Sequence, residues 1–372
     1  MFFNKAIFTF ITTILLPFAI FSQGTIAPKY SNEFLQIGVS ADALGMSNAV
    51  VAKTNSVHSG YWNPAGLTEL ENGFHVGAMH SEYFAGIAKY DYLSIAKKID
   101  EKSAFGFSAI RFAVDDIPNT TQLIDNQGNI DYERISTFTA ADYAFLFSYG
   151  RKLNVEGLSV GGNFKIIYRQ IGKFAKAWGF GLDGGVQYKK GEHWKFGLMM
   201  RDATSTFNAW IFNLDPQMQQ VFVNTGNELP TNGLELTLPR LILGAHVQYP
   251  LGKKGFFIGS EIDLPITTDG RRNTIIQSKP FSIDPCVGLE VGFREYVTIR
   301  AGIGNMQYIK NFDDSRSFTL QPNIGISVGI KYVTLDYAFT DIGDASTALY
   351  SHVISLKARI VKSTKKENQT KL

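Results

Sequence analysis

Two short motifs in this 372-residue chain match patterns that perform chemistry in enzymes. Residues 179–184 (Gly-Phe-Gly-Leu-Asp-Gly) match the GxGxxG turn that binds dinucleotides, and residues 325–329 (Gly-Ile-Ser-Val-Gly) match the GxSxG elbow of hydrolases. The first needs a strand-to-helix turn that points a helix N-terminus at a phosphate, and the second needs a strained turn into a helix. Here both lie inside alternating apolar and polar stretches. We therefore expect strands, without a nucleotide site or a nucleophilic serine.

The histidines and the single cysteine are the other candidates for chemistry. Six histidines are scattered along the chain without a metal-binding spacing, at positions His58, His75, His80, His193, His246 and His352. Cys286 has no partner for an intramolecular disulfide, and no carboxylate pair stands out as a general acid and base. We expect no metal, no cofactor and no enzymatic activity.

The elements that position these residues repeat with a period of two. Residues 143–149, 178–188 and 324–332 each place apolar or aromatic side chains on one face, with glycine and polar side chains on the other. Successive side chains alternate across a strand, so these segments predict strands with one apolar face.

About fourteen such strands are expected, an even number as in bacterial outer-membrane barrels. They cover residues 73–80, 90–98, 103–112, 138–151, 157–169, 176–189, 193–202, 238–250, 255–263, 282–294, 297–305, 321–332, 333–340 and 350–360. Connections after the even-numbered strands are short, and the long ones (113–137, 203–237, 264–281 and 306–320) all follow odd-numbered strands. Short turns belong on the periplasmic side, which predicts an all-β, up-and-down transmembrane barrel with both termini in the periplasm.

Two features favour a membrane barrel over a soluble sandwich. Apolar faces often begin or end in an aromatic residue, as at Trp178 and Tyr188, which suits interfacial girdles. The opposite faces combine glycine with charge and are expected to point inward. The charged side chains predicted to face inward are Lys165, Arg169, Asp183, Lys195, Arg201, Glu290, Arg294, Lys331, Asp336, Lys357 and Arg359.

The two ends of the chain differ from the body. Lys5 followed by an apolar stretch and by Ser22-Gln23 predicts a signal peptide over residues 1–23, and hence export to the outer membrane and its lipid. A polar, disordered tail is expected over 361–372. Lys5 contributes +1 and the tail a net +3 to the formal charge of +3, which leaves about −1 for the body; such a near-neutral body argues against nucleic acid as a partner.

Residues 24–72 do not alternate, and we expect them to form a compact plug inside the lumen. The plug motif is Asn63, Pro64, Ala65, Gly66 and Leu67, in which Asn63-Pro64 initiates a turn and Ala65-Gly66 permits close backbone approach. A direct contact of this motif with a ligand is the alternative. We place the barrel itself at 73–360.

This segment carries a family resemblance. Residues 45–49 (Gly-Met-Ser-Asn-Ala), ahead of the plug motif, resemble the N-terminal signature of FadL-like barrels, and the stretch 34–67 is most similar to the PorV/PorQ proteins of Bacteroidetes. The resemblance implies fourteen strands and a plug. It also implies one of two functions. A PorV/PorQ-like protein is a type IX secretion adaptor or shuttle, with secretion-system proteins and cargo C-terminal domains as partners. A FadL-like protein passively transports hydrophobic small molecules.

The residues themselves bear on this choice. A lumen lined by charge is a poor conduit for fatty acids, which favours the adaptor. A structural barrel without cargo is the third possibility.

One predicted extracellular connection, 203–237, is unusually apolar. Its apolar residues recur at three- and four-residue spacing, which predicts an amphipathic helix interrupted by Pro216. It is expected either to fold over the barrel mouth or to contact a partner or ligand. The candidate contact residues are Phe207, Trp210, Ile211, Leu214, Met218, Val221 and Phe222.

Overall fold

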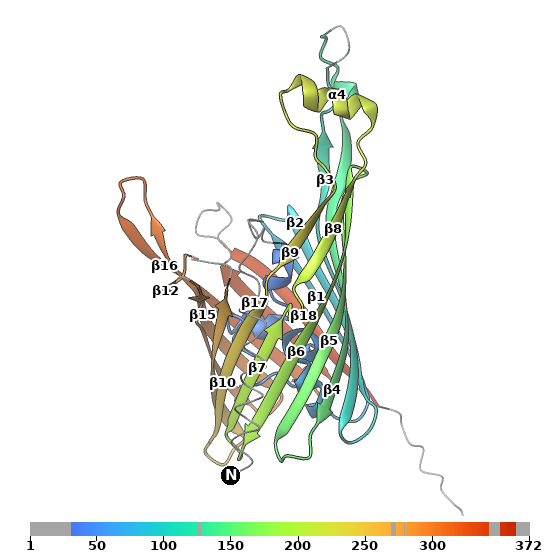
Figure 1. Ribbon diagram of the computed structural model, residues 1–372. Helices are drawn as coiled ribbons and strands as arrows, with labels where there is room; N and C mark the ends of the chain where they lie inside the picture. Colours follow the sequence, from blue (N-terminus) through green and yellow to red (C-terminus); the bar gives the residue numbers. More distant parts are fainter. Residues whose placement is uncertain (1–30, 125–127, 269–272, 279, 342–349, 362–372) are drawn as a thin grey trace, which may run out of the picture.

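Fourteen antiparallel strands close into a barrel in the computed structural model of the chain (Figure 1). The structure describes residues 31–124, 128–268, 273–278, 280–341 and 350–361. The predicted signal peptide, and the predicted tail beyond Val361, lie outside these residues. The barrel strands are β1 (Phe74–Tyr83), β2 (Ala88–Lys98), β3 (Ser103–Asn119), β4 (Ser136–Lys152), β5 (Leu158–Ile171), β6 (Ala175–Lys190), β7 (Trp194–Arg201), β10 (Arg240–Leu251), β11 (Phe256–Thr267), β14 (Cys286–Phe293), β15 (Val297–Lys310), β16 (Arg316–Ile330), β17 (Val333–Asp341) and β18 (Tyr350–Ile360).

Each barrel strand pairs with the next, and β1 pairs with both β2 and β18, so no edge remains in the wall. Closure satisfies every ladder of backbone hydrogen bonds, which is the requirement for strands that face lipid. The predicted strand number and the alternation of short and long connections are confirmed. The two motifs at 179–184 and 325–329 lie within β6 and β16, as expected.

The alternation of side chains sorts the wall into two faces. On β16, Ile324, Ile326 and Val328 are 59%, 41% and 45% exposed and point outward, whereas Ser327 between them is 5% exposed and points inward. Most charged residues predicted to face the lumen do so, and Lys165, Asp183, Arg201, Glu290 and Asp336 are buried there. The apolar band therefore lies outside and the polar lining inside.

Several elements project beyond the rim at the long-loop end (Figure 1). Strands β8 (Thr206–Phe212) and β9 (Gly233–Thr237) pair with one another, and β8 continues the line of β7 along β6. Helix α4 (Pro216–Asn224) joins them at the tip. The ends of β3 and β4, with the 3-10 turn η4 (Tyr132–Arg134), rise beside them. Two further short strands, β12 (Ile276–Gln277) and β13 (Ser282–Ile283), lie beside β11 and β14.

The predicted amphipathic helix is wrong for the first part of this connection. Phe207, Trp210 and Ile211 belong to strand β8, and only residues 216–224 are helical. Residues 207 and 211 share a face in a helix and in a strand alike, so their spacing does not distinguish the two. Pro216 does not interrupt a helix but begins one, and Asp215 caps it by accepting a hydrogen bond from the Met218 N–H.

Residues 31–73 form an N-terminal segment of short helical turns that lies against the inward faces of the strands (Figure 1). Its elements are η2 (Glu33–Gln36), α2 (Ala41–Leu44), α3 (Ser59–Trp62) and η3 (Pro64–Glu69). No helix in the described part of the chain is long and apolar enough to cross a membrane.

Candidate functional site

Two cavities lie on either side of the N-terminal segment. The larger, of about 790 Å³, is lined partly by residues of the short turns, and we call it the short-turn chamber. The smaller, of about 320 Å³, lies toward the long loops, and we call it the long-loop cavity. Trp62 contributes to the lining of both, so it stands at the boundary between them. The indole of Trp62 is 4% exposed, and its Nε1 donates to the Val39 carbonyl at 3.0 Å.

Asn63 fastens the segment to the wall directly after Trp62. Its Nδ2 donates to the carbonyls of Val51 at 3.1 Å and Val186 on β6 at 3.0 Å, while its Oδ1 accepts from the Ala65 N–H at 3.3 Å. The Asn63 side chain therefore caps η3, links two parts of the N-terminal segment and binds strand β6 of the barrel. The prediction that Asn63-Pro64 initiates a turn is confirmed, with Pro64 in the first turn of η3.

Glycines in the wall make this approach possible. A Cβ on Gly161 would lie 2.5 Å from the Ala65 nitrogen, and one on Gly185 would collide with Asn63 Oδ1. Both glycines occupy inward positions of neighbouring strands, β5 and β6. The glycine-rich inner face of the strands therefore accommodates the main chain of the N-terminal segment.

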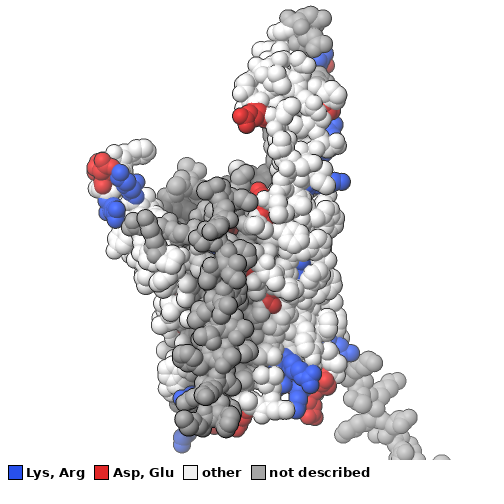
Figure 2. Space-filling view, in the orientation of Figure 1, with Lys and Arg blue, Asp and Glu red and all other residues white. Residues whose placement is uncertain are grey.

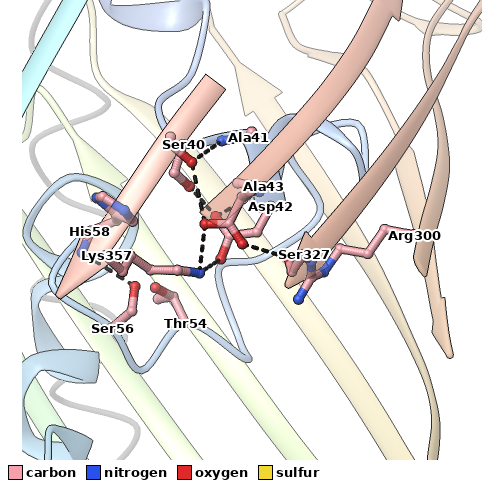
Figure 3. Close-up of polar contacts among 12 residues, drawn as sticks. Ser40, Ala41, Asp42, Ala43, Thr54, Ser56, His58, Arg300, Ser327 and Lys357 are labelled. Carbon is pink, nitrogen blue, oxygen red and sulfur yellow. Dashed lines mark hydrogen bonds and ion pairs between the residues drawn. The ribbon is translucent and has the colours of Figure 1, made fainter. Parts of the chain in front are cut away.

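A partly buried ion-pair group holds helix α2 to strands β17 and β18 (Figure 3). Lys357 Nζ lies 2.5 Å from Asp42 Oδ2 and 3.2 Å from Asp336 Oδ2. Ser355 Oγ accepts from the Ala41 N–H at 2.9 Å. Burial alone would raise the pKa of Asp42, but the nearby positive charges, Lys357 first and then Arg300, together outweigh burial and hold that pKa well below its usual value.

Two carboxylates on β11 bind a run of backbone donors. Asp263 Oδ2 accepts from the N–H groups of Val50 at 2.9 Å and Val51 at 3.0 Å. Glu261 accepts from the next two, Ala52 at 2.6 Å and Lys53 at 3.1 Å. Four consecutive N–H groups of a turn form a site for negative charge, and two wall carboxylates occupy it here.

Arg201 completes the attachment near β7, beside a buried lysine that pairs within the wall. The Arg201 guanidinium lies 4.4 Å from the Tyr61 ring centroid and donates to the Leu35 carbonyl at 3.0 Å. Lys165 Nζ lies 2.7 Å from Asp183 and 2.5 Å from Asp202, so one ammonium pairs with two carboxylates inside the wall. The segment is thus bound to several strands around the barrel by hydrogen bonds and ion pairs.

The predicted plug motif lies together in this attachment. Asn63 to Leu67 are all buried, and Leu67 packs with Val57, Leu70, Ala96 and Ala104. His58 lies in the same region, and burial lowers its pKa to about 4.

The residues predicted for the outer connection do not converge on one surface. Phe207 and Ile211 are exposed on the outward face of β8, whereas the Trp210 ring lies under the Arg169 guanidinium at 5.1 Å. Met218 on α4 is buried. A contact of this set with a partner or ligand stays a prediction.

Sequence reasoning missed several residues of the site, among them Asp42, Trp62, Glu261 and Asp263. For Glu261 and Asp263 a signal existed, because residues two apart in a strand share a face. Asp42 and Trp62 lie outside the alternating region, where no local pattern relates them to the wall.

Comparison with known proteins gives a likeness of fold. No family model matches the chain, and no curated protein matches it by sequence. Three solved structures resemble it with a TM-score of 0.52: the CymD monoaromatic hydrocarbon channel, the toluene transporter TbuX of Ralstonia pickettii and the toluene transporter TodX of P. putida. In the same order, their sequences are 14%, 14% and 13% identical to this chain. Each match covers 87% of this chain, and it covers 98%, 99% and 99% of the three known proteins. Most of the chain therefore shares its fold with nearly the full length of these proteins.

Proposed function

We propose that the protein is an outer-membrane barrel that carries small hydrophobic molecules in the manner of FadL-like transporters. One observation supports this most directly: the likeness to a hydrocarbon channel and two toluene transporters extends over almost their entire length. At this sequence identity the likeness concerns the fold, so the cargo is part of the proposal.

The outer surface supports a membrane location. Large apolar side chains such as Leu289, Ile299 and Leu335 are about half exposed around the wall. In Figure 2 the charged side chains gather mainly at the short-turn end and on the projections, and the wall between them is mostly uncharged. An exposed apolar band of this extent suits lipid and not water.

In this proposal the N-terminal segment acts as a plug that separates two compartments. A molecule that moves along the barrel axis has to displace the region around Trp62, because that side chain lines both cavities. The short-turn end and both chain termini would lie in the periplasm. Protease treatment of intact cells tests the orientation: cleavage should occur in the projections and not at the short turns.

Uptake by whole cells tests the cargo. A host that lacks comparable barrels is given the protein, and entry of radiolabelled toluene is measured against a host without it. We expect uptake to rise several-fold, and Trp62→Ala to raise it further by opening the boundary. Trp178→Ala is the matched control, since Trp178 is 47% exposed on the outward face of β6. Equal uptake with and without the correctly inserted barrel would refute the proposal.

A second candidate is the PorV/PorQ-like secretion adaptor, and the tall projection favours it. Strand β9 pairs with β8, and in Figure 1 the projection that carries helix α4 rises well above the barrel rim, where a secretion protein or a cargo C-terminal domain can reach it. Deletion of the gene in its own cell should then block surface delivery of cargo proteins. Unchanged delivery would remove this candidate and leave the transport proposal intact.

A further inference from the structure

Several charged groups line the short-turn chamber, and one partly buried lysine among them forms no ion pair within the described residues. Most charged groups in the chamber are paired: Lys53 lies 2.5 Å from Glu290, Arg300 lies 3.2 Å from the same carboxylate, and Lys357 is held by Asp42. Lys195 on β7 also lines the chamber and is partly buried. Within the described parts of the chain, no carboxylate lies at ion-pair distance from its ammonium.

The strand register places a buried histidine directly beside this lysine. His246 on β10 is the cross-strand partner of Lys195 and is 3% exposed. Its Nδ1 makes no hydrogen bond, although Glu261 Oε2 lies 3.4 Å away. Gln248, two residues further along β10 and hence on the same face, also lines the chamber.

The Glu261 carboxylate beside His246 is held by backbone donors of the N-terminal segment. Both oxygens of Glu261 already accept hydrogen bonds from the backbone of Ala52 and Lys53. Lys195, His246 and Gln248 together present an ammonium, an imidazole N–H and a carboxamide N–H to the chamber.

We propose that Lys195, His246 and Gln248 form a binding site for a small oxyanion, the carboxylate or phosphate group of a polar solute. The chamber volume of about 790 Å³ is that of a pocket for a metabolite-sized molecule. Lys189, Glu192 and Glu295, which also line it, come from the short turns and the adjoining strand end, so the solute enters from that side. This site extends beyond the proposed cargo, because its ligand is hydrophilic.

Calorimetric titration of the purified full-length protein in detergent, at low ionic strength, tests the site. Sodium acetate and inorganic phosphate are the two probes, and they separate carboxylate from phosphate recognition. We expect saturable one-to-one binding of at least one of them. Lys195→Met should weaken that binding at least tenfold, and Lys195→Arg, which keeps the charge, should weaken it by threefold or less.

Lys189→Met is the matched control. Lys189 carries the same charge and lines the same chamber, but it is exposed beside the short turn, and its removal should change the affinity less than twofold. Absence of saturable binding by both probes would overturn the proposal, as would an equal loss in the Lys195 and Lys189 variants. Neither result depends on toluene uptake, so this test and that of the proposed function fail separately.

Discussion

Removal of the Lys357 ammonium should destabilise the barrel more than removal of either carboxylate that it joins. Lys357 Nζ lies between Asp42 on the N-terminal segment, at 2.5 Å, and Asp336 on β17, at 3.2 Å. The side chain of Asp336 is fully buried, and those of Lys357 and Asp42 are 19% and 21% exposed. Lys357→Met leaves two carboxylates facing one another, and loss of one partner from a buried pair costs about 3–5 kcal/mol.

Asp42→Asn should cost less, about 1–3 kcal/mol, because Lys357 keeps Asp336 as its counter-ion. The assay is reversible guanidinium unfolding of the detergent-solubilised protein, followed by tryptophan fluorescence at pH 7. Lys310→Met is the control: its pair with Asp314 is exposed on a projection, and its loss should cost about 0.5 kcal/mol or less. The reasoning is refuted if Lys357→Met costs no more than Lys310→Met, or if Asp42→Asn costs as much as Lys357→Met.

The pH dependence of the same pair has a definite sign. The pKa of Asp42 is lowered in the folded state, since Lys357 and Arg300 together outweigh the opposing effect of burial. A lowered carboxyl pKa contributes stability that is complete above the unfolded value of about 3.9 and is lost as the pH falls through the folded value. The difference between the wild type and Asp42→Asn should therefore shrink below about pH 4.

Three further outcomes are expected. Burial lowers the pKa of His58 to about 4, so as the pH falls below about 6.5 the imidazole takes up a proton in the unfolded state before it does so in the folded state. The free energy of unfolding should therefore drop by about 3 kcal/mol between pH 7 and pH 4. In denaturant titrations at a series of pH values, His58→Gln should make that drop smaller. Gly185→Ala should destabilise the fold by about 1–3 kcal/mol, because the added Cβ collides with Asn63. Gly184→Ala is the control and should be nearly neutral, since a Cβ there meets nothing within 4 Å. Equal denaturation midpoints for the two variants would contradict this packing. Cys286 is 7% exposed, so a maleimide should label it only on unfolding, and rapid labelling of the folded protein would contradict its burial.

The sequence by itself determined the barrel wall, because strand periodicity is local. One apolar and one polar face per segment, interrupted by turns, predicted fourteen strands and the separation of short from long connections. On the long-loop side the strands extend further than the sequence predicts. The predicted third strand ends at residue 112, whereas β3 extends to Asn119. The apolar alternation fades there because the projecting part of a strand has no lipid-facing side.

The same local pattern failed at the outer connection. Phe207 and Ile211 lie four residues apart, a spacing that fits both a helical stripe and one face of a strand. These residues form a strand because β8 pairs with β6 on one side and with β9 on the other. Only the helix that follows Asp215 and Pro216 had a local signal, the cap and the proline at its first turn.

The candidate site depended on tertiary structure. Asp42 and Lys357 are separated by 315 residues, and the backbone donors at 50–53 lie more than 200 residues before Glu261 and Asp263. No local period relates such positions, because their approach follows from closure of the barrel around the N-terminal segment. The sequence predicted a charged, glycine-lined interior, and the closed barrel decided which of those charges are paired and where the two cavities lie.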